Sequence, residues 1–290
     1  MAARAARSLL LVAAVLPAGC ARAVNYLEPA APMHAWRAPA GPASAAADPP
    51  PGRPWRVVTF NVAYAIEIER AIGVLRQAAE LQSADVVALQ EMDAPGTERI
   101  ARALGLNAVY FPSGVHPKHR RDFGCALLSP WPLAAASKLL LPHGARVSGL
   151  RRAAVSATVV RGGERVRVYS LHLPSPLGVS GSARRQQLRT IAADAASRDL
   201  PVIVAGDFNS HGQCQELVRA GFDWVTRDVG DSVRLRLLGI GIAGMSYDHV
   251  LVKGLRRAAG PRSAGVVADN RGASDHRPVW ALVEVLEAAH

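Results

Sequence analysis

Cysteine, aromatic side chains and acidic charge are all scarce in this chain of 290 residues. The three cysteines include no metal-type pair, which argues against a zinc-binding scaffold. Aromatic residues make up 5% of the chain, and no aromatic platform interleaves with the basic clusters, so recognition of single-stranded nucleic acid by base stacking is not expected. No internal repeat is visible, and no apolar run at the N-terminus is long enough to span a bilayer.

Residues 1–20 are typical of an export signal. Arg4 and Arg7 form a short positive region, and residues 8–16 form an apolar stretch. Small residues precede Cys20, as in a bacterial lipoprotein signal, although Pro17 stands where leucine is usual. We therefore expect an exported protein that is either anchored to the membrane through a lipidated Cys20 or secreted, into the periplasm or the medium, after cleavage nearby.

The remainder divides into a linker and one domain. Residues 21–54 are rich in proline and alanine and lack periodicity, which predicts a flexible tether. Residues 55–288 alternate apolar strand-like and helix-like segments, and we interpret them as one domain. Cys125 and Cys214 lie in this domain. Export permits a disulfide between them, which their spacing does not show. Two separate buried thiols are slightly favoured, because no metal-type cysteine pair is present.

Basic residues outnumber acidic residues by 34 to 23, which gives a net charge of +11. This excess favours an anionic partner: nucleic acid, a phosphate ester or an acidic membrane surface. Because the basic residues are scattered, a general arginine-rich composition is an equal explanation. No protein partner is expected, and we expect a monomer.

Hydrophobic periodicity predicts many strands and few helices. Helices are expected over 68–79, 97–104, 182–197 and 213–220, and strands over 56–62, 85–90, 108–111, 123–129, 152–160, 165–173, 201–205, 247–252 and 279–285. Few of the strands alternate regularly with helices, which suggests two packed sheets flanked by helices. The apolar, glycine-rich stretch 232–244 is interpreted as a connector, with a loop on the substrate side as the alternative.

Polar side chains recur where the expected strands end. The stretch Gly206-Asp207-Phe208-Asn209 follows a buried strand and supplies an acid that can accept a proton and an amide that can orient water or a phosphate oxygen. Buried charges need a partner or a metal. The other strand-end residues of this kind are Asn61, Glu91, His172, Asp248, Asp275 and His276. Brought together, they would bind a hard divalent cation and a phosphate.

Six segments in this order resemble the endonuclease/exonuclease/phosphatase superfamily. They are Thr59-Phe60-Asn61-Val62, Leu89-Gln90-Glu91, Ser170-Leu171-His172, Gly206-Asp207-Phe208-Asn209, Tyr247-Asp248-His249 and Ser274-Asp275-His276-Arg277-Pro278-Val279. The superfamily includes deoxyribonuclease I-like nucleases, inositol polyphosphate 5-phosphatases and neutral sphingomyelinases. The resemblance covers nearly all of residues 55–285. It implies an α/β (α+β) fold, a four-layer sandwich of two packed mixed β-sheets flanked by helices.

The resemblance also implies roles for single residues. Glu91, Asn61 and Asp275 would hold Mg²⁺, with Mn²⁺ as an alternative. In the catalytic set, Asp207 would activate the attacking water, Asn209 would hold the water or a phosphate oxygen, Asp248 would orient His276, and His172 would contact the phosphate or protonate the leaving group. Either Asp207 or the His276–Asp248 pair serves as the base, and His249 is taken as structural.

Arginine suits phosphate because its guanidinium presents a planar fork of donors. Arg121, in the loop 118–121, and Arg152 are the expected substrate contacts, whereas Arg184 and Arg185 are assigned to the solvated face of a helix. The expected function is an exported, Mg²⁺-dependent phosphoesterase acting by in-line attack of water, with nucleic acid of little sequence preference as substrate. The alternatives are a sphingomyelinase-like phospholipid or inositol-phosphate phosphoesterase and a catalytically silent binding module.

Overall fold

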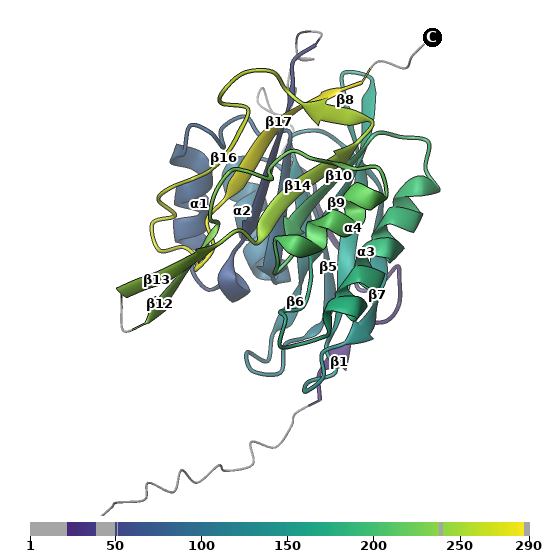
Figure 1. Ribbon diagram of the computed structural model, residues 1–290, viewed down its shortest axis with the longest axis vertical. Helices are drawn as coiled ribbons and strands as arrows, with labels where there is room; N and C mark the ends of the chain where they lie inside the picture. Colours follow the sequence, from purple (N-terminus) through teal and green to yellow (C-terminus); the bar gives the residue numbers. More distant parts are fainter. Residues whose placement is uncertain (1–21, 39–49, 51, 238–239, 287–290) are drawn as a thin grey trace, which may run out of the picture.

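Two mixed β-sheets packed face to face form the centre of the fold (Figure 1). The computed structural model describes residues 22–38, 50, 52–237 and 240–286. The expected export signal with Cys20, and residues 39–49 of the expected tether, lie outside the described residues. Within the described part of the chain, none of the helices combines the length and apolar character needed to cross a membrane.

The first sheet has the strand order β1-β5-β6-β4-β3-β17-β15, with β2 paired to β5 and β16 paired to β17. Its strands are β1 (Val24–Asn25), β2 (His34–Trp36), β3 (Trp55–Asn61), β4 (Val86–Met92), β5 (Asn107–Val115), β6 (Asp122–Ser129), β15 (Leu255–Arg257), β16 (Ala264–Val266) and β17 (Val279–Val285). At its centre β3 and β4 run parallel, so both present their C-terminal ends at the same edge.

The second sheet has the order β11-β14-β10-β9-β8-β7. Its strands are β7 (Leu133–Gly144), β8 (Arg151–Arg161), β9 (Glu164–His172), β10 (Val202–Asp207), β11 (Asp223–Trp224) and β14 (Asp248–Lys253). Strand β10 runs parallel to β9 and antiparallel to β14. Strand β7 was not predicted, because its alanine-rich, half-buried sequence lacks the alternation that marks a strand.

Helices cover the outer face of each sheet, so the predicted four-layer sandwich is confirmed (Figure 1). Helices α1 (Ile68–Gln77) and α2 (Ala94–Leu104) pack on the first sheet, and α3 (Gly181–Ala196) and α4 (Gln215–Arg219) on the second. Two short 3₁₀ helices, η1 (Ala63–Ala65) and η2 (Gly212–Cys214), follow β3 and precede α4. Helix α2 starts at Asp93, whose side chain accepts a hydrogen bond from the Gly96 backbone N–H.

The central core lies between the two sheets and contains no helix residue. Trp55 and Val57 of β3 pack there against Val168 of β9 and Ile203 of β10. Because strand side chains alternate between faces, each central strand also contributes to an outer core beneath its helices. Burial on both faces explains why residues 202–207 form an almost continuous apolar run.

Residues 22–38 differ from the flexible tether predicted there. Strands β1 and β2 pair with β5 and extend the first sheet. Lys138 is buried and donates from Nζ to the carbonyl oxygens of Tyr26, at 2.8 Å, and Ala31, at 2.6 Å. Backbone pairing to an available strand edge needs no hydrophobic periodicity, which is why the composition of this segment was misleading.

The connector predicted at 232–244 is instead a two-stranded hairpin. Strands β12 (Val233–Leu237) and β13 (Ile240–Met245) pair with each other and extend away from the sandwich (Figure 1). Residues 233–237 alternate apolar and basic side chains, as a strand does, but the glycines that follow them favoured the interpretation as a connector. The pairing of the two strands has a register shift between Leu235 and Arg236. The two cysteines, Cys125 and Cys214, are buried free thiols, as the interpretation of separate thiols predicts.

Candidate active site

Strand register places three of the expected site residues in one row across the second sheet. Asp207, the last residue of β10, is paired with His172 on one side and with Asp248 on the other. Residues in register on neighbouring strands point to the same face of a sheet, so these side chains converge. All three are buried.

The first sheet supplies the opposing side chains. Asn61 ends β3 in register with Gln90 of β4, and Glu91 follows. The Asn61 amide nitrogen donates to Glu91 Oε1 at 3.2 Å and, across the gap between the sheets, to Asp207 Oδ2 at 3.0 Å. The site therefore lies at the strand ends between the two sheets, where the motifs placed it.

A buried hydrogen-bond network lies behind the site and ties the sheets together. Thr59 Oγ1 donates to Gln90 Oε1 at 3.2 Å, Gln90 Nε2 donates to Ser170 Oγ at 3.1 Å, and Ser170 Oγ donates to the Leu89 carbonyl at 3.1 Å. Such a network fixes the spacing between the sheets, because leaving any member unpaired would cost about 1–3 kcal/mol. Gln90 and Ser170 belong to the motif segments, but no pattern in the sequence indicates this role.

The Asp207 carboxylate is surrounded by hydrogen-bond donors. Besides Asn61, the Asn209 side chain lies 3.2 Å from Oδ2, His172 Nε2 lies 3.4 Å away and His276 Nε2 lies 3.7 Å away. The Asn209 backbone N–H donates to the other oxygen, Oδ1, at 2.7 Å. Five groups from four strand ends therefore aim at one carboxylate.

The backbone of the site is held in unusual conformations. Glu91 and Asn209 have positive φ angles of 58° and 50°, and Tyr64 of η1 has 59°. Non-glycine residues adopt this region rarely, and such strain concentrates at functional sites. Gly206 is needed for a different reason, because a Cβ there would lie 2.0 Å from the Leu171 carbonyl oxygen of β9.

His276 is a buried imidazolium held by Asp248. Its Nδ1 lies 2.8 Å from Asp248 Oδ2, which leaves Nε2 facing Asp207. Burial lowers the pKa of His276, but the charges of Asp248 and Asp207 outweigh burial and raise this pKa to about 10. His276 therefore carries a positive charge at neutral pH.

His172 is neutral and lies between two hydrogen-bond donors. Burial lowers its pKa well below the usual value, and the positive charges of Arg152 and His276 lower it further. Arg152 Nη1 lies 3.4 Å from His172 Nδ1, and His172 Nε2 lies 3.2 Å from the side-chain nitrogen of Asn209 and 3.4 Å from Asp207 Oδ2. The expected phosphate contact Arg152 thus belongs to the cluster.

Burial disfavours the charged forms of the acids Glu91 and Asp207 in this site. Burial is the main cause that raises the pKa of Glu91. Burial also raises the pKa of Asp207 to about 7; His276 opposes this shift and Asp248 adds to it. The Asp248 atom Oδ1 is buried without a hydrogen-bond partner among the described residues. A cation is the group that would relieve these costs.

The donor set fits a hard divalent cation. Ligand atoms of Asp207, Asp248 and His276 lie within 4.8 Å of one another, but the hydrogen bond between Asp248 and His276 already engages two of these three. Glu91 and Asn61 offer oxygen ligands on the opposite sheet, and the Glu91 side chain keeps 13% of its surface exposed. Carboxylate and amide oxygens suit Mg²⁺ and Mn²⁺ rather than softer metals.

Comparison with models of protein families gives one family for this chain. Residues 58–276 match the model of the Endonuclease/Exonuclease/phosphatase family. The chain belongs to the endonuclease/exonuclease/phosphatase family. The predicted resemblance is therefore confirmed, and members of this family are hydrolases acting on phosphoester bonds. The comparison with curated protein sequences gives no significant match.

Solved structures of the same fold are distant in sequence. An endonuclease/exonuclease/phosphatase family protein from Leptotrichia buccalis C-1013-b is similar with 18% identity and a TM-score of 0.63, over 79% of this chain and 99% of that chain. TDP2 of D. rerio, complexed with a single-strand DNA product, has 15% identity and a TM-score of 0.60 over 80% and 99%. Sphingomyelinase C from Streptomyces griseocarneus has 19% identity and a TM-score of 0.55, over 79% of this chain and 99% of that chain.

Three residues, Asp275, Arg121 and Arg184, have surroundings that differ from those predicted from the sequence. Asp275 is exposed, and its carboxylate accepts a hydrogen bond from Ser274 Oγ at 3.3 Å, so it reaches Glu91 and His276 through its charge alone. Arg121 forms an ion pair with Asp93, the residue that caps α2. Arg184, assigned to a solvated face, is buried and donates to the Asn209 carbonyl at 3.2 Å, which supports the strained turn after Asp207.

Sequence reasoning missed an aromatic cluster beside the site. Tyr64, His116, His119 and Phe123 come from η1, from the loop between β5 and β6, and from β6, and their rings contact one another. They adjoin the basic stretch 118–121, where the sequence indicated no aromatic platform. Tyr64 is far in sequence from the other three residues, so neither composition nor spacing predicts that the four rings contact one another.

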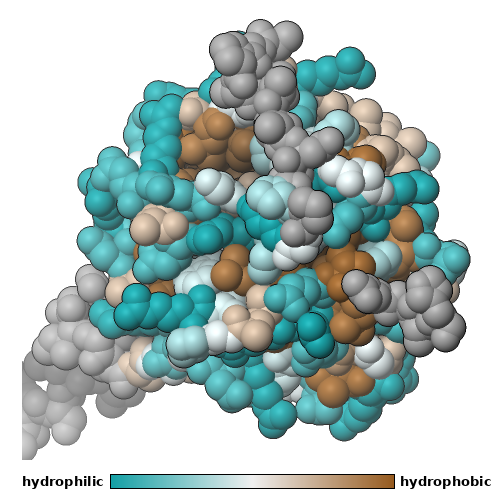
Figure 2. All heavy atoms as spheres, turned by 90° about the horizontal axis from the view of Figure 1, so that it is seen from above, coloured by the Kyte–Doolittle hydropathy of each residue, from teal (hydrophilic) through white to brown (hydrophobic). Residues whose placement is uncertain are grey.

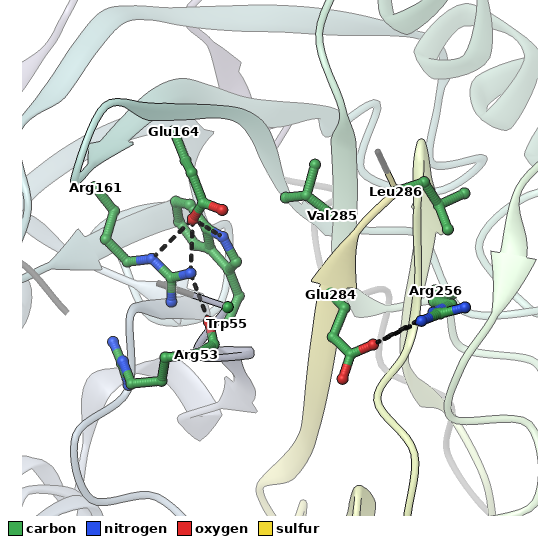
Figure 3. A pocket seen from close by; sticks show the side chains of 9 residues that line it. Arg53, Trp55, Arg161, Glu164, Arg256, Glu284, Val285 and Leu286 are labelled. Carbon is green, nitrogen blue, oxygen red and sulfur yellow. Dashed lines mark hydrogen bonds and ion pairs between the residues drawn. The ribbon is translucent and has the colours of Figure 1, made fainter. Parts of the chain in front are cut away.

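A cavity at the opposite end of the sandwich is not the site. Figure 2 shows this end, with hydrophobic patches among hydrophilic residues. The cavity, of about 420 Å³, lies at the start of β3, whereas Asn61 ends that strand. Its arginines are paired with acids, Arg161 with Glu164 at 2.7 Å and Arg256 with Glu284 at 3.2 Å (Figure 3). These pairs neutralise the arginine charge that would attract a phosphate.

Proposed function

We propose that this protein is an exported, Mg²⁺-dependent phosphodiesterase that cleaves nucleic acid with little sequence preference. The observation that carries the proposal is the convergence of donors from both sheets on the Asp207 carboxylate, beside the buried acid Glu91. Such a site can activate a water and stabilise a phosphoryl group at the same place, which is the requirement for in-line hydrolysis.

The protonation states assign the base. Because the pKa of His276 is raised to about 10, this residue is charged at neutral pH and acts as a donor to a phosphate oxygen. Asp207, whose pKa is raised to about 7 chiefly by burial, is the group that accepts the proton of the attacking water. Asp248 holds His276 in the orientation that presents Nε2–H to the substrate.

The remaining residues position and neutralise the phosphate. When bound, Mg²⁺ would offset negative charge on the phosphate oxygens, and Glu91 and Asn61 would hold it. The Asn209 side chain, fixed by a 2.9 Å hydrogen bond to the Leu173 carbonyl, orients the water or a phosphate oxygen. Arg152 presents a positive charge next to the neutral His172, with Nη1 3.4 Å from His172 Nδ1.

Charge favours nucleic acid among the phosphodiesters. The net charge is +11, and the exposed residues Lys118 and Arg120 lie in the loop before Phe123, whose ring adjoins His172. Phosphate contacts of this kind give affinity without sequence preference. The structure of D. rerio TDP2 with a DNA product shows that this fold can hold such a product. The similar sphingomyelinase C keeps a phospholipid as the second candidate substrate.

Export is proposed from residues 1–20 alone. Their basic start, apolar stretch and Cys20 support a lipid-anchored or secreted protein. Expression of the full chain in a bacterium, with labelled palmitate, tests this directly. Label on the protein that is lost in Cys20→Ser supports anchoring, whereas an unprocessed chain in the cytoplasm would contradict export.

A substrate panel tests the activity. The purified domain is incubated with plasmid DNA, single-stranded RNA, sphingomyelin vesicles, an inositol phosphate and a generic phosphodiester, each with Mg²⁺ and with EDTA. We expect cleavage of nucleic acid that EDTA abolishes. Preferential hydrolysis of sphingomyelin or inositol phosphate would move the protein to the alternative substrate class. Absence of activity on every phosphoester with either Mg²⁺ or Mn²⁺ would favour the silent binding module.

A further inference from the structure

We propose that Tyr64 and His119 form a stacking site for the nucleobase next to the scissile phosphate. The rings of Tyr64 and His119 are stacked, with centroids 4.0 Å apart and an interplanar angle of 27°. The ring of His116 lies edge-on to Tyr64 at 4.9 Å. We call Tyr64, His116, His119 and Phe123 the aromatic wall. This inference rests on the proposed function, because it names which part of a nucleic-acid substrate this surface contacts.

The aromatic wall is attached to the active site at two points. The Tyr64 backbone N–H donates to Glu91 Oε2 at 3.1 Å. At the other end, the Phe123 ring lies 5.8 Å from the His172 ring, and the Arg152 guanidinium lies over Phe123 at 4.5 Å. A phosphate held by His172 and Arg152 would therefore place its neighbouring sugar and base along this wall.

The conformation of Tyr64 is maintained against a backbone cost. Residues 63, 64 and 65 all have positive φ angles, of 41°, 59° and 53°. A run of three such non-glycine residues is energetically unfavourable, because L-amino acids rarely adopt this left-handed region. The turn is held by the hydrogen bond from Tyr64 to Glu91 and by one from Ala63 N–H to Asn61 Oδ1 at 3.0 Å. The strain has the effect of presenting an aromatic ring beside the expected metal ligands.

The chemistry of the wall fits a base better than a cation. Lys118 and Arg120 on the same loop are exposed and repel a quaternary ammonium headgroup, whereas they attract a polyanion. The pKa values of His116 and His119 are lowered, mainly by burial, so both rings are neutral and stack as uncharged heterocycles.

The test compares substrates that differ only in their bases. The dinucleotide TpT is used with two analogues, one lacking the base on the 5′ side of the phosphate and one lacking the base on the 3′ side. For the wild type, kcat/KM is expected to fall about tenfold for one of the two analogues, which is typical of the loss of one aromatic–base stack. In His119→Ala this preference should disappear, and in His119→Phe it should return.

Three further variants separate stacking from charge and from folding. Tyr64→Leu should lose the preference and Tyr64→Phe should keep it. Lys118→Gln should lower kcat/KM for all three substrates in parallel, because it removes charge but no ring. Arg256→Gln, at the opposite end of the molecule, should change none of them. If His119→Ala fails to fold, as judged by its Tm, the Tyr64 pair decides the question.

The outcomes distinguish this inference from the proposed function. Cleavage of all three substrates at equal rates by the wild type, or a preference unchanged in His119→Ala and Tyr64→Leu, would overturn the stacking site while leaving the phosphodiesterase intact. Absence of cleavage of TpT and of plasmid DNA would overturn both. A loss in His119→Ala that is confined to a phosphocholine diester would assign the aromatic wall to a quaternary ammonium group instead.

Discussion

At the scale of single residues, the site places amide groups and two imidazoles around the Asp207 carboxylate. Asp207 is buried between a charged His276 and a neutral His172, and each of these histidines is oriented by a second residue, Asp248 or Arg152. Two imidazoles in one site thus have opposite protonation at neutral pH because their neighbours differ. The site therefore contains one charged imidazole, His276, and one neutral imidazole, His172.

The raised pKa of His276 predicts a pH-dependent stability of the metal-free protein. Its pKa is about 10 in the folded state and about 6.5 when unfolded, so its stabilising effect is complete below pH 6.5 and is lost as the pH rises to 10. In EDTA, the difference in unfolding free energy between wild type and His276→Gln should shrink across this window. Urea unfolding at pH 6, 8 and 10 measures it, and a difference that grows with pH would contradict the assignment.

The chemistry-bearing residues were predictable because acids, amides and histidines at strand ends stand out from an apolar background. Asn61, Glu91, His172, Asp207, Asn209, Asp248 and His276 all meet in the structure. The stacking of Tyr64 on His119 was not predictable, because it depends on a left-handed turn and a loop whose conformations leave no periodic trace. The burial of Arg184 was missed because its helix shows only weak amphipathicity.

At the scale of elements, register brings the site together. Parallel pairing of β9 with β10 and of β3 with β4 presents strand ends at one edge, and the antiparallel strand β14 begins at that edge with Asp248. The strongly apolar strands were predictable from sequence. Strands β1, β2 and β7 were not, because they lie at the sheet edges and their sequences lack regular alternation. The hairpin β12–β13 was not, because the glycines after residues 233–237 outweighed the alternation of those residues in the interpretation.

The close approach of β10 to β9 at Gly206 predicts a sensitive position. A Cβ at Gly206 would meet three backbone atoms of Leu171, the nearest at 2.0 Å, so Gly206→Ala must displace one of the strands. We expect a loss of unfolding free energy of about 1–3 kcal/mol or more. Gly73→Ala is the matched control, because its Cβ meets nothing within 4 Å and alanine favours the helix. Equal stability of the two variants in urea would contradict this packing.

At the scale of the whole molecule, two sheets and their helices form one scaffold, and chemistry is confined to one end. The cavity at the other end is lined by compensated ion pairs, whereas the site end combines buried acids with exposed cations. Family membership followed from six short segments because each occupies a strand end in the shared fold. Substrate choice did not follow, since it depends on loops that vary around that scaffold.

Divalent cations should stabilise the folded protein as a whole. A ligand that binds only the folded state adds free energy by mass action, about 2.7 kcal/mol at a concentration one hundred times its Kd. We expect Mg²⁺ or Mn²⁺ to raise the Tm of the wild type and to raise that of Glu91→Gln far less. Glu284→Gln, which removes an acid at the opposite end, should respond like the wild type. An equal rise in all three proteins would place the cation elsewhere.

The most direct test of the whole account is single-turnover hydrolysis of the preferred phosphodiester by Asp207→Asn. This substitution keeps the size of the side chain but removes the group that accepts the proton, so the rate should fall by about 10²–10⁴-fold while the Tm shows a folded protein. Asp199→Asn, which changes an exposed acid in the same way, should match the wild type. A rate for Asp207→Asn within a few-fold of the wild type would show that the reaction does not take place at this carboxylate.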